Sequence, residues 1–194
     1  MKLALTCTIV DVMTSTDAQH TKFLGLLSDQ IRNEFTASQQ YIAVAVYFDD
    51  ADLPQLAKHF YRQAVEERNH AMMLVRYLVD RDIHAEIPGI DAVRNDFATP
   101  RAAIEMALAQ ERTVTEQITS LAAAARDEGD YLGEQFMQWF LKEQVEEVAS
   151  MTTLLRIAER AGDNLFHLED FVAREMPAAD GADATAPAAA GGAL

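Results

Sequence analysis

The chain has 194 residues, 49% of them hydrophobic, which is enough for one compact domain with a substantial core. Acidic residues outnumber basic ones by 31 to 16, and the net charge of -15 argues against nucleic acid or an anionic membrane as a partner. A single cysteine, Cys7, allows no disulfide within the chain, so the reducing cytoplasm is the expected location. With only 8 Gly and 5 Pro, the composition favours an all-α fold.

Four long segments carry apolar residues at alternating spacings of three and four, the pattern of a helix that buries one face. The first two are separated only by a short turn before Pro54, so they are expected to be antiparallel neighbours. Thr99 followed by Pro100 is typical of a helix start, and Gly129 with Asp130 separates the last two segments. A shorter amphipathic segment follows. The predicted helices cover residues 21–49, 54–81, 99–128, 131–162 and 164–175.

The connection over residues 82–98 is unusually long for a compact domain. When extended it can reach about 55 Å, whereas the preceding helix is about 40 Å long. It can therefore cross the bundle from end to end, which makes the second and third helices parallel. The flanking segments differ in kind: residues 1–20 are expected to be a flexible extension, and the Ala-, Gly- and Pro-rich residues 176–194 a disordered tail.

Every long helix interrupts its apolar stripe with polar residues near its middle. Side-by-side packing would put these residues into one buried layer, and a pair at i and i+3 would share a helix face. The spacing also repeats, because 33 residues separate the first two helices' acids and 33 separate the corresponding positions of the last two. The residues concerned are Glu34, Glu67 and His70, Glu111, and Gln144 and Glu147.

Buried carboxylates without compensation cost several kcal/mol each, and no Lys or Arg falls within these stripes. Two divalent metal ions bridged by carboxylates would supply the missing positive charge. Oxygen ligands with a single imidazole suit iron or manganese, although zinc could compete. A Glu-x-x-His pair alone is most often a solvated helix face; its occurrence together with matching acids in the other helices favours a two-metal site.

Over about residues 21–175, roughly four-fifths of the chain, the sequence resembles the non-haem bacterial ferritins. The resemblance is carried by Gln-Ala-Val-Glu-Glu-Arg-Asn-His at 63–70 and by Glu-Gln-Val-Glu-Glu at 143–147. It implies a ferritin-like four-helix bundle with a short fifth helix, assembled into a homo-24-mer shell. It also implies a ferroxidase that oxidises Fe(II) to Fe(III) with O2 or H2O2 and stores the ferric mineral inside the shell.

The same resemblance implies roles for individual residues. One iron of a di-iron centre would be held by Glu34, Glu67 and His70, and the second by Glu67, Glu111 and, more weakly or through a hydrogen bond, Gln144, so that Glu67 bridges the two.

Three further features follow from the resemblance. Tyr41 and Trp139 match aromatic positions beside the ferroxidase centre, where electron donation or hydrogen bonding has been considered. Arg68 stands where bacterioferritins carry a haem-ligating Met, so no haem is expected. A further iron site beside the di-iron centre would be formed by Glu66, Glu143, Glu146 and Glu147.

Two alternatives remain open at this stage. A di-iron or di-manganese oxidase or peroxidase could use the same bundle, although such proteins generally carry two Glu-x-x-His pairs, whereas this chain has Gln144 and Glu147. A helical scaffold that binds metal without turnover is the second alternative.

Overall fold

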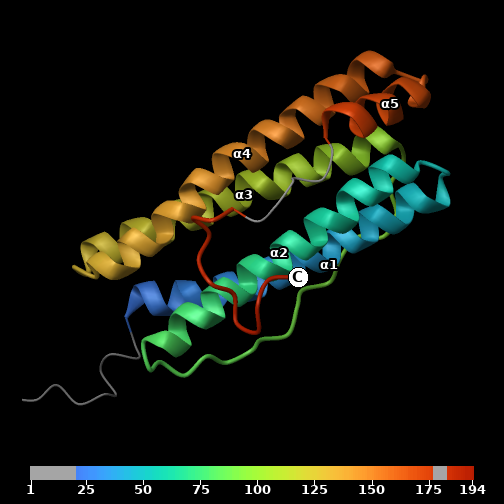
Figure 1. The fold of residues 1–194 in the computed structure, drawn as a ribbon. Helices are drawn as coiled ribbons and strands as arrows, with labels where there is room; N and C mark the ends of the chain where they lie inside the picture. Colours follow the sequence, from blue (N-terminus) through green and yellow to red (C-terminus); the bar gives the residue numbers. More distant parts are fainter. Residues whose placement is uncertain (1–20, 177–182) are drawn as a thin grey trace, which may run out of the picture.

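The computed structural model describes residues 21–176 and 183–194, and this part of the chain contains five helices and no strand (Figure 1). The predicted all-α four-helix bundle with a short fifth helix is confirmed. The predicted extension at residues 1–20 lies outside the described residues. The helices are α1 (Lys22–Asp50), α2 (Pro54–Asp80), α3 (Pro100–Asp127), α4 (Tyr131–Ala161) and α5 (Leu165–Glu175).

Side-chain caps set where three of these helices begin. The Thr21 side chain accepts a hydrogen bond from the third residue of α1, and Thr99 and Asp130 do the same for α3 and α4. Gly129 has a φ of 71°, a left-handed conformation that glycine adopts without strain, and it follows the end of α3. The residues that mark boundaries in the sequence therefore act as local start and stop signals.

The long helices form two antiparallel pairs, α1 with α2 and α3 with α4, joined mainly through α1 and α3. The connection after α2 runs along the side of the bundle to the start of α3, so α2 and α3 are parallel as predicted (Figure 1). This connection is fastened to α1. The Gln40 amide makes two 2.8 Å hydrogen bonds with the backbone of Arg94, and the Thr36 hydroxyl accepts one from the Asp91 amide.

Two apolar clusters fill the bundle, one toward each end. Along α1, Ile31 belongs to one cluster and Tyr41 to the other, with the buried Glu34 between them. Along α2, Ala64 and Leu74 flank the buried acid and histidine in the same way. The apolar packing thus stabilises both ends of the bundle and holds a polar layer at its middle.

The described part of the C-terminal tail makes contacts with the bundle. Residues 183–194 lie against the bundle, where the Ala190 amide donates to the carbonyl of Met72 at 3.0 Å. The indole of Trp139 donates to Asp183 at 3.1 Å. The alanine-rich composition of the tail gives no sign of these bonds. Among the described residues, no helix combines the length and apolarity that a membrane span requires.

Candidate metal centre

Glu34, Glu67 and His70 form a compact cluster at the middle of the bundle. Each side chain is at most 3% exposed, and one ligand atom from each lies within 4.8 Å of the others. Nδ1 of His70 is 3.2 Å from Oε2 of Glu67, as expected for residues one helical turn apart. The structure thus brings together the three residues that the sequence assigned to one metal ion.

Glu111 and Gln144 complete the layer from α3 and α4. Glu111 is fully buried and accepts a short hydrogen bond from the Tyr41 hydroxyl, which comes from α1. Oε1 of Gln144 accepts a hydrogen bond from the Thr115 hydroxyl at 2.9 Å. These bonds hold Glu111 and Gln144, two of the three predicted ligands of the second metal ion, in place.

Burial and mutual repulsion dominate the electrostatics of this layer. Burial raises the pKa of Glu67 well above its usual value, and the charges of Glu111 and Glu34 raise it further. Burial also raises the pKa of Glu111 to about 7, against the opposing effect of the Tyr41 hydrogen bond. The carboxylates therefore lack a compensating cation from the described residues of the protein.

Two carboxylate oxygens of the layer carry no hydrogen bond. Oε2 of Glu34 and Oε2 of Glu111 are both buried without a partner in the described part of the chain. Unpartnered buried acceptors are rare in folded proteins because each costs about 1–3 kcal/mol or more when charged. A divalent cation fits this donor set, since it would both bind the free oxygens and offset the repulsion.

Supporting contacts around the cluster include residues that the sequence did not single out. Gln30, 1% exposed and one turn before Glu34, donates from Nε2 to that carboxylate at 2.8 Å. Its Oε1 in turn accepts from Asn33 at 3.3 Å. Trp139 packs edge-on against His70, with 5.7 Å between ring centroids, which places this predicted aromatic neighbour at the cluster. The sequence signal for Gln30 is its spacing of one helical turn before Glu34.

A second group of acids lies beside the layer, between α2 and α4. Glu66, Glu143 and Glu147 offer carboxylate oxygens within 4.8 Å of one another. Glu146 lines the same pocket but is not part of this close group, because its side chain is 64% exposed and pairs with Lys142 at 3.6 Å. We call this cavity of about 280 Å³ the acidic pocket; it is lined by His59, Arg62, Gln63, Glu66, Glu143, Glu146, Glu147, Ser150, Glu175 and Met176.

Crowding of like charges is also evident in the acidic pocket. Burial and the charges of Glu66 and Glu146 raise the pKa of Glu143 to about 7. The pKa of Glu147 lies well above its usual value, first because it is buried and then because of its acidic neighbours. Gln63 donates to Glu66 at 2.7 Å and contacts Glu147 at 3.5 Å, so it joins the pocket to the central layer.

A four-helix bundle with a long crossover and a buried carboxylate–imidazole layer at its middle defines a class of helical metal-binding proteins. The family model for the ferritin-like domain matches residues 24–161 of this chain. The chain therefore belongs to the ferritin-like family.

Similar proteins support this assignment. Ferritin BfrB of Mycolicibacterium smegmatis is 76% identical over 182 residues, covering 94% of this chain and 100% of that protein. Ferritin BfrB of Mycobacterium tuberculosis is 66% identical, with the same coverage. A bacterial non-heme ferritin of Staphylococcus aureus is 37% identical over an alignment that covers 73% of this chain and 85% of the Staphylococcus protein. The solved structure of an open pore ferritin from Archaeoglobus fulgidus superposes on this chain with a TM-score of 0.77 and 27% sequence identity. The superposition covers 80% of this chain and 97% of the Archaeoglobus chain.

Proposed function

We propose that this protein stores iron by oxidising Fe(II) to Fe(III) at the buried midpoint layer and retaining the ferric product inside a shell of identical subunits. The observation that carries the proposal is the set of buried carboxylates with unpartnered oxygens at Glu34 and Glu111, next to Glu67 and His70. Family membership and the ferritin names of the most similar relatives support the same function.

Iron is the substrate of this reaction. In the proposed arrangement, Glu34, Glu67 and His70 bind one ferrous ion, and Glu67, Glu111 and Gln144 bind the second. Each ferrous ion gives up one electron, and the two electrons with two protons reduce O2 to H2O2 or H2O2 to water. Carboxylates favour the ferric product over the ferrous substrate because their negative charge stabilises the higher oxidation state.

The neighbouring side chains keep the ligands in place. Tyr41 holds the Glu111 carboxylate through its hydroxyl, and Gln30 holds Glu34. Burial raises the pKa of Tyr41 well above its usual value, and the Glu111 charge raises it further, so this hydroxyl stays protonated as a donor at neutral pH. We assign Tyr41 a positioning role at the centre. Replacement by Phe should slow ferrous oxidation, and unaltered kinetics in Y41F would remove the assignment.

We further propose that the acidic pocket binds iron beside the di-iron centre. The close group of Glu66, Glu143 and Glu147 supports this proposal, and Glu146 stands at its rim. Gln63 contacts both Glu66 and Glu147 and so provides continuity between the pocket and the centre.

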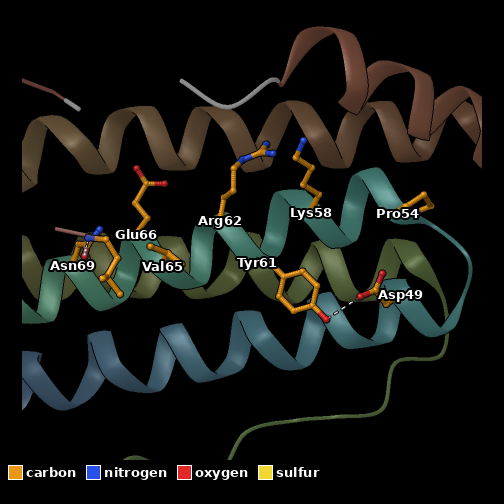
Figure 2. Close-up of a pocket in the computed structure, with 9 residues that line it drawn as sticks. Asp49, Pro54, Lys58, Tyr61, Arg62, Val65, Glu66 and Asn69 are labelled. Atoms are coloured by element: carbon orange, nitrogen blue, oxygen red, sulfur yellow. Dashed lines mark hydrogen bonds between the residues drawn. The ribbon is translucent and has the colours of Figure 1, made fainter. Parts of the chain in front are cut away.

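Assembly into a homo-24-mer is proposed from the family and supported by exposed apolar residues along α1 and α2. Four of these residues, Ile42 and Val46 of α1 and Tyr61 and Val65 of α2, are 38–44% exposed. Tyr61 and Val65 line a groove with a volume of about 630 Å³, and Figure 2 shows how these two side chains lie on α2. Covering such residues favours association. Sedimentation of the purified protein should give a particle of roughly 520 kDa, the mass of 24 chains of 21.5 kDa each. We expect this particle to be located in the cytoplasm. A monomer or dimer would contradict the shell.

The proposed activity is tested by adding ferrous iron and oxygen to the purified protein and to E67A and H70A variants. Absorbance of the ferric product should rise at least about a hundredfold more slowly in both variants, because each loses a ligand of the centre. Glu116, exposed on α3, supplies the matched control E116A, which should behave as the parent.

Two outcomes would separate the alternatives. Equal oxidation rates in the parent and in E67A would refute the ferroxidase proposal and leave a scaffold that binds metal without turnover. Rapid oxidation without retention of many irons per particle would refute storage and favour an oxidase on the same bundle.

A further inference from the structure

A buried histidine in the acidic pocket has no role in the centre described above. His59 of α2 is 6% exposed, and its Nε2 is buried without a hydrogen-bond partner in the described residues. Its ring contacts Phe60 edge-on, with 5.1 Å between centroids, which fixes one side of the imidazole by apolar packing. A buried polar atom of this kind costs about 1–3 kcal/mol unless something binds it.

The position of His59 on α2 directs it toward the acids. His59, Gln63 and Glu66 are four and three residues apart, so they share one face of the helix, and all three line the acidic pocket. Figure 2 shows Arg62 and Glu66 extending from α2 on the side toward α4, away from Tyr61 and Asp49. This side of α2 therefore forms one wall of the pocket.

The pocket extends beyond the close group of acids. Seven residues separate His59 from Glu66, which is about 10 Å along the helix, so one metal ion cannot bind both. Ser150 of α4 and Glu175 of α5 also line this pocket. Ser150 is close to one turn beyond Glu147 on α4, toward the end of the bundle where α2 begins. The close acidic group therefore occupies one end of the pocket and His59 the other, and Glu175 of α5 lines the same pocket.

Charge and protonation suit a cation at the second end. Five carboxylates line the pocket against one guanidinium, that of Arg62, whose Nη2 donates to the Met176 carbonyl at 2.9 Å. Burial, and secondarily the charge of Arg62, lower the pKa of His59 to about 4. The imidazole is therefore neutral near pH 7 and keeps a lone pair for a metal ion.

We propose that His59 and Glu175 form a separate binding site for a divalent cation, at which a ferrous ion docks before it moves along the acidic pocket to Glu66, Glu143 and Glu147. The metal-binding claim stands on the pocket itself; the identity of the ion as ferrous substrate rests on the proposed function. One imidazole with one or two carboxylates is a donor set that Fe(II) and Co(II) both accept. The remaining positions would be filled by water, which suits a site from which the ion moves on.

Co(II) alone is the probe, because it is stable in air and absorbs visible light when coordinated. Crystals of the full-length, metal-free protein are soaked in Co(II), and anomalous diffraction is recorded at the cobalt edge. We expect a peak within about 2.3 Å of a ring nitrogen of His59, distinct from any peak at the close acidic group. Absence of this peak would overturn the proposal, as would cobalt held by the acids alone.

A solution titration provides the matched comparison. H59Q and E175Q should each bind about one Co(II) per subunit fewer than the parent, or bind it at least about tenfold more weakly. The control H167Q removes an exposed histidine of α5 and should bind as the parent does. Equal Co(II) binding by the parent and H59Q would overturn the site even if H59Q folds normally.

The E67A variant distinguishes this proposal from the proposed function. Loss of oxidation in E67A with cobalt still bound at His59 would support both. Oxidation that survives in E67A would refute the di-iron centre, whereas the cobalt peak at His59 would still support the new site. Normal oxidation by the parent with no cobalt at His59 would refute this inference alone.

Discussion

Replacing Glu111 by Gln should make the metal-free protein more stable while it removes a proposed metal ligand. Burial raises the pKa of Glu111 from 4.5 to about 7, which corresponds to about 3 kcal/mol of unfavourable free energy once the group is ionised in both states. The amide of the variant can still accept the Tyr41 hydrogen bond but carries no charge. We therefore expect the free energy of unfolding of the metal-free E111Q variant to exceed that of the parent by about 3 kcal/mol at pH 8.

The sign of the pH dependence follows from the direction of the pKa shift. A carboxyl whose pKa is raised by folding destabilises the protein as pH rises from 4.5 to about 7, and the full cost is present above that range. The advantage of E111Q should thus shrink to under about 1 kcal/mol at pH 5.

Thermal unfolding of chelator-treated protein at one scan rate measures this difference. A gain of 3 kcal/mol corresponds to a midpoint higher by roughly 6–12 °C at pH 8 for a chain of this size. E116Q, which neutralises an exposed acid on the same helix, is the control and should shift the midpoint by less than about 2 °C. An E111Q midpoint equal to or below that of the parent at pH 8 would refute the claim that Glu111 is buried as an uncompensated acid.

Two other perturbations test the surroundings of the centre. Q30L removes the donor to Glu34, so Co(II) binding at the midpoint should weaken about tenfold; unchanged affinity in a titration would contradict a positioning role for this amide. G133A would bring a Cβ within 2.6 Å of the Phe23 ring and should lower the unfolding midpoint through a loss of about 1–3 kcal/mol. The matched control is G25A in α1, where the added Cβ has no atom within 4 Å, and its free energy of unfolding should rise by about 0.5–1 kcal/mol. An unfolding midpoint of G133A as high as that of G25A would argue against the close contact between Gly133 and Phe23.

Much of the fold follows from signals that are local in sequence. Thr99 with Pro100 and Gly129 with Asp130 mark helix ends because caps and left-handed glycine act within a few residues. The parallel course of α2 and α3 was predictable from chain length alone, since the connection is long enough to cross the bundle. The central acids were predictable because a buried carboxylate violates an otherwise regular apolar stripe.

Other features depend on contacts that periodicity does not contain. Glu146 is exposed because it lies about 100° around α4 from Glu147, so a shared sequence motif does not give a shared face. The packing of α5 against α2 and α4 brings Glu175 into the pocket that His59 lines, and the apolar pattern of α2 does not predict this. The path of residues 183–194 rests on individual hydrogen bonds such as that from Trp139 to Asp183, for which alanine-rich composition offers no signal.

The position of two metal ions at the bundle midpoint is the central claim, and anomalous diffraction tests it most directly. Crystals loaded with ferrous iron without oxygen should show two iron peaks in the buried layer, with the Glu67 carboxylate between them. Glu34 and His70 should bind the first peak, and Glu111 should bind the second. A single peak, or iron bound only on the surface and in the acidic pocket, would contradict the di-iron centre.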